Sequence, residues 1–404
     1  MILPEYGLSE RIGSTGGNLG DQVRRRNLAD VLSHVHQGGP HTRAELTRLS
    51  GLNRSTIARL VTELVDLDLV QESEPRDTGV VGRPSPIVHA NDDIVAICVN
   101  PDVDAITLGL IGLGGKIQSR VRYPTIGVPT VHEMISIVSK VVRESFAEVL
   151  DDFRIIAVGI AVPGIVRVDQ GVVEFAPHLG WENEPVAQLM REGLGYPAFA
   201  ANDANLGTIA ECLYGTASGM TDVIYLNGSR SGIGGGVIVN DRPLSGAHGF
   251  GAELGHTSVT PDGERCYCGH RGCLETEVSL SRLLGVLGQT SMDPDDLGHA
   301  VETSSDKQLW REINRQLDIL AVAISNFISV FNPEIVVLAG FLGELLDANP
   351  TRLHERVESN SFRHLSADVR IVRSQLGSQH LLVGAAELAF ASILNDPISV
   401  DRIS

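Results

Sequence analysis

The sequence predicts an α/β protein with two similar lobes that follow a small, mainly helical domain. From Asn91 onward, continuous apolar runs of strand length alternate with helical segments, which is typical of a sheet covered on both faces. The order of strands, helix and strand begins again near Asp222, which indicates a second lobe and a cleft between the two. From Asn18 to Ala90 the apolar spacing is instead that of short helices.

The N-terminal region contains a tail and a first helix. Residues 1–17 are glycine-rich and polar without a clear period, so we expect a flexible tail. Apolar positions at helical spacing predict a helix over Asp21–His36, which Gly38-Gly39-Pro40 would end.

Two further helices are expected directly after it. Thr42 and Glu45 form a capping box for a helix that should bury Leu46 and Leu49 and end at Gly51. Asn53 then caps a third helix. Two short helices joined by a glycine-containing turn form a helix-turn-helix. The inward positions of the third helix are Ile57, Leu60, Val61 and Leu64.

The start of the third helix carries short or forked hydrogen-bonding side chains, as a helix that enters the major groove of DNA requires. Residues 79–86 place Arg83 between glycine and proline, and strand-like runs over Leu67–Glu72 and Ile87–Ala90 flank them, which predicts a wing that probes a minor groove. We therefore expect a winged helix-turn-helix that binds double-stranded DNA. The alternative is a helical module that binds another protein. The expected DNA contacts are Arg43, Asn53, Arg54, Ser55, Thr56, Arg59 and Arg83.

Charge and hydropathy limit the partners. The net charge of −18 argues against nucleic acid as a partner of the whole chain. However, residues 18–90 hold nine arginines and nine acidic residues, whereas the rest holds 23 basic and 41 acidic residues. A neutral, arginine-bearing segment can still bind DNA. No apolar run is long enough to span a membrane, and no basic start precedes an apolar run as in a secretion signal, so we expect a cytoplasmic protein.

One loop contains three of the five cysteines. Cys266, Cys268 and Cys273 follow His256 by ten, twelve and seventeen residues, and one imidazole with three thiolates is the ligand set of a closed tetrahedral zinc site. Four protein ligands leave no open position, so such a zinc would be structural. The alternatives are a disulfide or buried free thiols.

The larger part should place polar groups at the cleft. Asn202 and Asp203 open a helix after a strand, and an aspartate there can accept a hydrogen bond from a substrate hydroxyl or take its proton. The alternative for both residues is a helix cap alone. With Glu253, His256 and Glu275 they form a suitable set for holding several sugar hydroxyls. The expected elements are strands Ile94–Val99, Ala105–Ile111, Lys116–Arg122, Ile155–Val162, Asp222–Leu226, Gly235–Val239 and Ile335–Ala339, and helices Val131–Leu150 and Trp310–Phe331.

The sequence resembles the ROK family of bacterial sugar-responsive repressors and sugar kinases over Asn18–Ala391. The motifs that carry the resemblance are residues 161–164, 176–181, 202–205, 231–236, 251–256 and 266–275. The resemblance implies an actin-like pair of ribonuclease-H-type lobes. It also implies a structural zinc on His256, Cys266, Cys268 and Cys273, and sugar contacts from Asn202, Asp203, Glu253, His256 and Glu275. In the family's kinases the residue that matches Asp203 is the general base.

The chain departs from the kinases of that family where ATP would bind. They share an Asp-x-Gly-Gly-Thr turn after the first strand, whereas here the turn begins at Asn100, lacks glycine and contains Pro101, Asp102 and Asp104. Proline removes one amide donor, and the two new carboxylates would repel a triphosphate. Arg230-Ser231 replaces a Gly-Thr pair, and Phe341 is bulky in a turn where kinases have glycines.

We therefore expect a DNA-binding transcriptional regulator, a repressor, that binds a sugar or sugar derivative and has lost catalysis. The alternative is an ATP-dependent sugar kinase with a DNA-binding domain, in which Asp203 would be catalytic. A third possibility is a DNA-binding regulator that binds no small ligand and responds only to a protein partner. We expect a homodimer or homotetramer. The expected domains are residues 18–90 for the winged helix-turn-helix, 91–201 with helix 380–395 for the smaller lobe, and 202–379 for the larger lobe.

Overall fold

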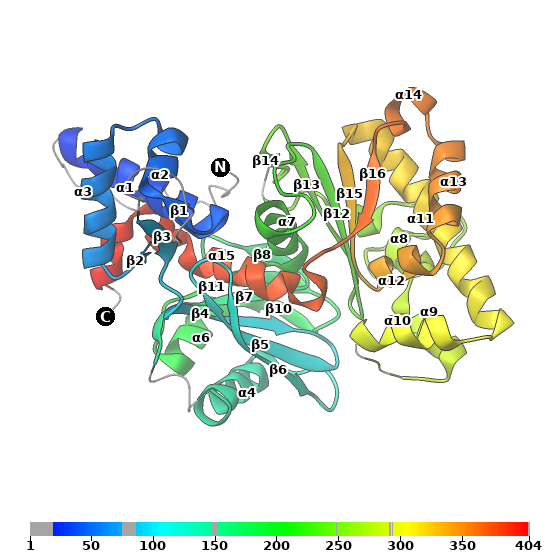
Figure 1. Ribbon diagram of the computed structural model, residues 1–404. Coiled ribbons are helices and arrows are strands. Elements are labelled where there is room, and N and C mark those ends of the chain that lie inside the picture. The colour runs from blue at the N-terminus through cyan, green and yellow to red at the C-terminus, as the bar shows by residue number, and fades with distance from the viewer. Residues whose placement is uncertain are drawn as a thin grey trace.

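The computed structural model describes residues 19–74, 86–146, 152–247, 249–290, 292 and 294–402. A helical N-terminal domain lies at one end of the molecule, and two lobes, each with a central sheet, follow it (Figure 1). Within these described ranges, no helix is both long and apolar enough to cross a bilayer.

The N-terminal domain contains the predicted helix-turn-helix. The capping box at Thr42 and Glu45 is present, and the Asn53 side chain accepts a hydrogen bond from the Thr56 amide. Leu46 is fully buried, but Leu49 is 51% exposed, so the prediction that Leu49 faces the core is wrong. The elements are α1 (Leu19–Gly38), β1 (His41–Thr42), α2 (Arg43–Ser50), α3 (Arg54–Asp66), β2 (Val70–Ser73) and β3 (Ile87–Ala90).

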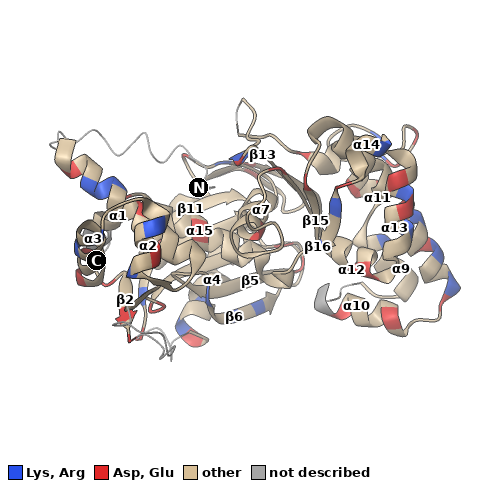
Figure 2. Cartoon of the chain, turned by 45° about the horizontal axis from the view of Figure 1, so that its top comes forward, with Lys and Arg blue, Asp and Glu red and all other residues tan. Residues whose placement is uncertain are grey.

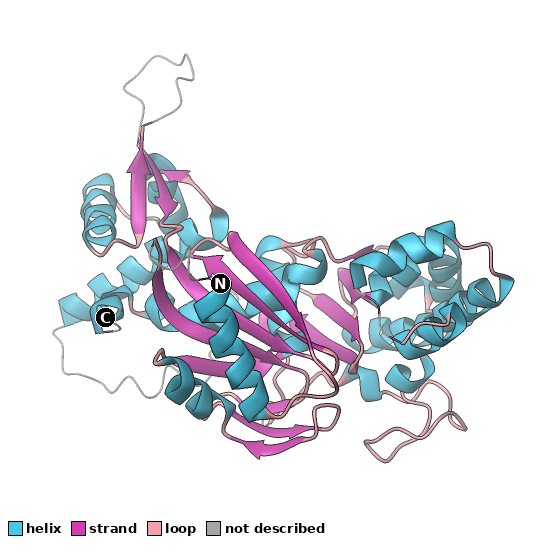
Figure 3. Ribbon diagram, turned by 90° about the horizontal axis from the view of Figure 1, so that it is seen from below, coloured by secondary structure: helices cyan, strands magenta, loops and turns pink. Residues whose placement is uncertain are grey.

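The three short strands form one sheet in the order β1-β3-β2. Seen from below, the β2–β3 hairpin projects away from the lobes (Figure 3). The predicted wing, with Arg83, falls on residues 79–86 and so lies almost entirely outside the described residues.

The first lobe has a five-stranded sheet in the order β11-β7-β4-β5-β6. The β4–β5–β6 meander is antiparallel, whereas β4, β7 and β11 run parallel. The elements are β4 (Ile94–Pro101), β5 (Ala105–Gly112), β6 (Ile117–Pro124), α4 (Val131–Glu144), β7 (Arg154–Val162), β8 (Ile165–Arg167), β9 (Val172–Ala176), β10 (Trp181–Glu184), α6 (Val186–Leu194) and β11 (Ala198–Asn202).

The second lobe repeats this topology with the sheet order β14-β13-β12-β15-β16. Its meander β12–β13–β14 is again antiparallel, and β12, β15 and β16 are parallel. The elements are α7 (Asp203–Tyr214), β12 (Val223–Ser229), β13 (Gly232–Val239), β14 (Arg242–Pro243), η2 (Leu254–His256), α8 (Leu274–Glu277), α9 (Leu280–Leu287), α10 (Pro294–Thr303), α11 (Lys307–Phe331), β15 (Ile335–Gly340), α12 (Phe341–Ala348), α13 (Pro350–Asn360), α14 (Arg363–Ser366), β16 (Arg370–Arg373) and η3 (Gly377–Gln379).

Two helices connect the parts of the molecule. The helix α15 (His380–Asn395) packs on the first sheet and on α7, and it also contacts α1 of the N-terminal domain. Its approach to the sheet is close, because a side chain at Gly159 would place Cβ 1.9 Å from the Ala385 carbonyl oxygen. The helix α7 contacts β12 and β13 of the second lobe as well as α15. The 3-10 helix η4 (Pro397–Arg402) follows α15.

Candidate functional site

The cysteine and histidine cluster is formed by one loop that closes on itself. The ligand atoms of His256, Cys266, Cys268 and Cys273 all lie within 4.8 Å of one another. The loop is held by the Cys266 amide, which donates to the His270 carbonyl oxygen at 2.9 Å. It also needs Gly272, which has a φ of +65° and would otherwise place Cβ 1.6 Å from the Thr260 carbonyl oxygen. One nitrogen and three sulfur donors at this spacing fit a tetrahedral metal ion.

A cavity of about 190 Å³ lies beside this cluster, between the two lobes. All five side chains predicted to contact a sugar line it. Asn202 and Asp203 reach it from the start of α7, because the N-cap of this helix lies at the end of β11. Glu253 precedes η2, and Glu275 lies on α8, two residues after the last cysteine of the cluster. The lobes and the loop therefore bring these residues together.

Burial perturbs the carboxyl groups in this cavity. Desolvation raises the pKa of Asp203 to about 7, and the nearby Asp102 and Glu253 carboxylates add to the shift. Desolvation also raises the pKa of Glu253 and raises the pKa of Glu275 to about 7. Asp203 accepts a hydrogen bond from the Ala204 amide and Glu275 accepts one from the Cys266 thiol, but neither carboxyl forms an ion pair with an arginine or lysine in the described structure. Sugar hydroxyls can therefore supply further hydrogen bonds to these buried groups.

The imidazole of His256 is shared between the cluster and the cavity. Its Nδ1 atom lies 3.5 Å from the Cys266 Sγ atom, and its Nε2 atom lies 2.8 Å from the Tyr267 hydroxyl. Tyr267 in turn packs edge-on against His178, with 4.9 Å between the ring centroids. Tyr267 and His178 both line the cavity, although sequence reasoning did not assign them a role. In the sequence, Tyr267 lies between the predicted zinc ligands Cys266 and Cys268, and this position could have indicated that it lies near the site.

The turn after β4 is built differently from a phosphate cradle. The Asn100 side chain donates to the Ala161 carbonyl oxygen at 2.9 Å, and the Asp102 amide donates to the Ala105 carbonyl oxygen at 2.8 Å. Asp104 pairs with Arg122 at 3.2 Å. The Asn100 side chain, the Asp102 amide and the Asp104 carboxylate of this turn thus have partners within the protein. The Asp102 carboxyl is close enough to Asp203 to help raise the pKa of that group.

The two other predicted differences from the kinases lie at Arg230 and Phe341. The Arg230 guanidinium donates to the Thr290 carbonyl oxygen at 2.6 Å. Phe341 is only 1% exposed, and its ring packs on Gly228, where an added Cβ would come within 2.5 Å of it. The Phe341 ring thus turns into the core of the second lobe.

Of the expected DNA contacts, all except Arg83 lie among the described residues, at the start of α2 and in the first part of α3 with its N-cap. Arg54, Ser55 and Arg59 are exposed on α3, while Asn53 is exposed at its N-cap and Thr56 is half-buried. Arg43, at the start of α2, makes a two-pronged ion pair with Glu72 on β2, with contacts of 2.6 and 2.5 Å. Both basic and acidic positions occur over this domain in Figure 2, in keeping with its neutral charge.

This architecture defines a class: a helix-turn-helix domain joined to two ribonuclease-H-type lobes, with a Cys/His cluster beside the cleft. Comparison with known families agrees with it. The ROK family matches residues 96–392, and the IclR helix-turn-helix domain matches residues 27–74. The chain therefore belongs to the ROK family.

Individual relatives cover nearly the whole chain. The Xylose repressor of Caldicellulosiruptor bescii is 26% identical, over 93% of this chain and 98% of the relative. The DNA-binding transcriptional repressor Mlc of Escherichia coli is 25% identical, over 91% and 93%. Among solved structures, a ROK family transcriptional regulator homologous to Mlc shares the fold with a TM-score of 0.74 at 24% identity, over 95% of this chain and 99% of that one. A ROK glucokinase from Streptomyces griseus, solved with glucose and AMPPNP, has a TM-score of 0.63 at 26% identity, over 73% and 98%.

Proposed function

We propose that this chain is a transcriptional repressor that binds DNA and takes a sugar as its effector. One observation carries the proposal: the exposed helix α3 and the cavity with Asn202, Asp203 and Glu253 occur in the same chain. Both of the relatives described above match over more than nine-tenths of the two chains and are named as repressors, which supports the same function.

The effector would bind in the cleft between the lobes. Sugar hydroxyls can donate to the Glu253 and Asp203 carboxylates and can accept from the Asn202 amide group. Binding there would change the closure of the lobes. In a dimer this movement changes the separation of two recognition helices, and operator affinity depends on that spacing.

We further propose that the Cys/His cluster holds a structural zinc ion. His256, Cys266, Cys268 and Cys273 supply four donors, so the ion would stabilise the loop between Glu253 and Glu275 rather than take part in a reaction. The test is Cys268→Ser, with zinc content and the sugar-induced rise in melting temperature as readouts.

We expect Cys268→Ser to lower zinc affinity more than about tenfold and to shrink the response to sugar, while DNA affinity changes little. The matched control is Cys212→Ala, which removes a buried thiol away from the cluster and should leave zinc content unchanged. Full zinc occupancy and an unchanged sugar response in Cys268→Ser would contradict the proposal.

The regulator function is tested by selecting bound sequences from a random duplex pool with the purified protein. We expect one sequence family to be enriched, with two half-sites, and a sugar from a panel to weaken its binding. The variant with Arg54→Ala and Arg59→Ala should lose binding at an unchanged melting temperature, because neither side chain makes an ion pair within the described residues. No enrichment over the pool would refute DNA recognition.

A further inference from the structure

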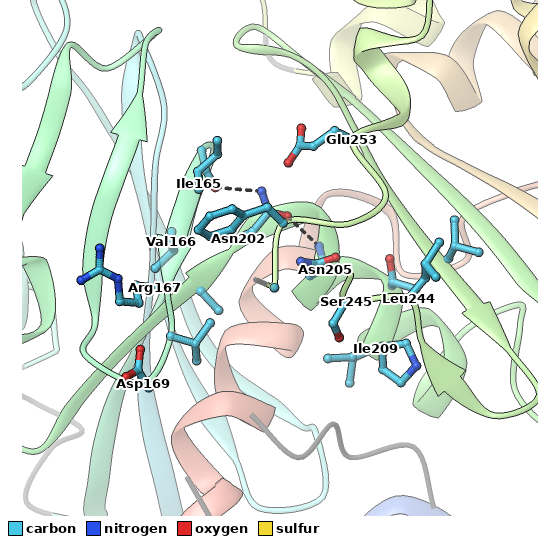
Figure 4. Close-up of a pocket in the computed structure, with 18 of the residues that line it drawn as sticks. Ile165, Val166, Arg167, Asp169, Asn202, Asn205, Ile209, Leu244, Ser245 and Glu253 are labelled. Atoms are coloured by element: carbon cyan, nitrogen blue, oxygen red, sulfur yellow. Dashed lines mark hydrogen bonds between the residues drawn. The ribbon is translucent and has the colours of Figure 1, made fainter. Parts of the chain in front are cut away.

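A second, outer cavity of about 230 Å³ adjoins the sugar cavity. The two cavities have Gly164, Ile165, Asn202 and Glu253 as common lining residues, so they meet at these side chains. Figure 4 shows Glu253 above Asn202 at this junction, with Ile165 to Arg167 on one side and Leu244, Ser245 and Ile209 on the other. The outer cavity therefore lies between β8 of the first lobe and the β14 edge of the second, with α7 between them.

The outer cavity has apolar walls and a few polar groups. Val166, Ile209 and Val237 contribute apolar surface. The side chains of Asn205 and Ser245 line the same space, and within the described part of the chain neither makes a hydrogen bond. A pyranose or furanose ring has this character, because it has apolar C–H faces and a polar rim.

The volume of the outer cavity indicates whether it would hold a small substituent on the sugar or a second sugar ring. The outer cavity, at about 230 Å³, is at least as large as the inner one at about 190 Å³. An outer cavity as large as the cavity for the first sugar ring can hold a second sugar ring. Resting on the proposed function, we propose that the effector is a disaccharide, with one ring in each cavity and the glycosidic bond beside Asn202 and Glu253.

The test is titration calorimetry with matched sugars: xylose and xylobiose, glucose and cellobiose or maltose, N-acetylglucosamine and its β-1,4-linked dimer. We expect one disaccharide to bind at least about tenfold more tightly than its monosaccharide. Ser245→Trp should remove this preference and leave monosaccharide affinity unchanged, because the indole would fill the outer cavity only. Leu244→Trp is a second variant of the same kind, and both residues are exposed, so folding should persist.

The matched control is Arg242→Trp, an exposed position on β14 that does not line the cavity. Equal affinities for each monosaccharide and its dimer would overturn the disaccharide proposal and leave sugar sensing standing. A full disaccharide preference in both tryptophan variants would also overturn it. If no sugar of either size binds, the sugar-sensing function fails, and the disaccharide proposal fails with it.

A separate observation concerns a buried polar junction between the DNA-binding domain and the lobes. His36 of α1, Tyr214 at the end of α7 and Glu387 of α15 meet there. The His36 Nε2 atom lies 2.8 Å from the Glu387 Oε1 atom and 2.9 Å from the Tyr214 hydroxyl, which also donates to Glu387 Oε1 at 2.8 Å. His36 is 1% exposed and Glu387 is 2% exposed.

The hydrogen bonds specify how the imidazole is protonated. The Gly114 amide donates to the His36 Nδ1 atom at 2.8 Å, so Nδ1 carries no proton. Nε2 is then the protonated nitrogen and donates to Glu387. All three side chains are thus fixed relative to one another in a buried setting, where a lost partner is costly.

The helix α7 joins this junction to the effector cavity. It begins at Asp203, which lines the cavity, and ends at Tyr214, which contacts His36. Its 12 residues span about 18 Å as a rigid rod. Resting on the proposed function, we infer that His36, Tyr214 and Glu387 are positioning residues that transmit movement of α7 to the DNA-binding domain.

The test is Tyr214→Phe, which removes the hydroxyl and keeps the ring. DNA affinity is measured on the sequence selected from the pool, with and without the active sugar. We expect the ratio of the two affinities to fall at least about fivefold toward one, while sugar affinity in the absence of DNA stays within about twofold. Glu387→Gln, which keeps the size of the side chain, should reduce the ratio in the same way.

The control is Tyr225→Phe, because the Tyr225 hydroxyl is also buried but has no hydrogen-bond partner in the described structure. It should leave the ratio unchanged. An unchanged ratio in both Tyr214→Phe and Glu387→Gln would overturn the inference. If sugar does not alter DNA affinity in the unmodified protein, the proposed function itself fails.

Discussion

The buried carboxyl of Asp203 makes a prediction about pH. Its pKa in the folded protein is about 7, against an ordinary value of 3.8. Between these values the folded protein retains a proton that the unfolded chain has released, so this group makes the free energy of unfolding fall as pH rises. From pH 5 to pH 8 the loss is about 3 kcal/mol, because each pKa unit corresponds to about 1.4 kcal/mol.

Asp203→Asn should remove this dependence. We expect the melting temperature of the variant, relative to the unmodified protein, to rise by several degrees between pH 5 and pH 8. Glu275 titrates equally in both proteins, so the comparison isolates Asp203. A difference in melting temperature that stays constant with pH would show that the Asp203 carboxyl is ionised at both values.

Single residues also show what the sequence could predict about the site. The spacing of His256 and the three cysteines predicted their convergence, because the ligands lie in one loop. Asp102 is different. It is distant in sequence from Asp203, and its carboxyl influences that group only because β4 and β11 lie in the same sheet on either side of β7. Such a tertiary contact leaves no pattern in the local sequence.

At the scale of helices and strands, local sequence patterns predicted the elements that have a clear apolar period or a capping motif. The strands β4, β5 and β7 and the helices α1, α3 and α11 lie where the apolar pattern placed them. The two-residue strand β1 was not predicted, because it contains too few residues for a period. The exposure of Leu49 depends on neighbouring elements, which explains why it was assigned wrongly.

Caps give a test at this scale. The Thr42 hydroxyl accepts from the Glu45 amide at the start of α2, so Thr42→Ala should destabilise that helix by about 1 kcal/mol. We expect faster hydrogen exchange of the α2 amides and weaker DNA binding, with unchanged sugar affinity. Thr130→Ala is the matched control, because Thr130 and Glu133 form the same capping box on α4 in the first lobe. Faster exchange in α2 with full DNA affinity would show that this helix does not position α3.

At the scale of the whole molecule, two sheets of the same topology enclose one cleft, and α7 and α15 lie between them. The repeat was visible in the sequence, because the strand pattern begins again near Asp222. The contacts of α1 with α15 and α7 could not be seen in the sequence. His36 and Tyr214, and likewise Tyr214 and Glu387, are more than 170 residues apart along the chain. The fold of each lobe can thus be predicted largely from local sequence patterns, whereas communication between the parts depends on tertiary packing.

The cleft as a whole also predicts that the protein does not phosphorylate sugars. Phosphoryl transfer needs amides and cations that stabilise negative charge near the acceptor hydroxyl. Here the Asp102 carboxyl lies near Asp203, the Asp104 carboxyl pairs with Arg122, and the Asn100 amide group donates to Ala161. The turn after β4 thus presents carboxyl groups and amides that are already bonded within the protein, so we expect no ADP release above background from ATP and magnesium with any hexose or pentose. A ROK glucokinase assayed in parallel is the positive control. Turnover that disappears in Asp203→Asn would mean that Asp203 still acts as a general base, and the loss of catalysis inferred from the turn after β4 would then be wrong.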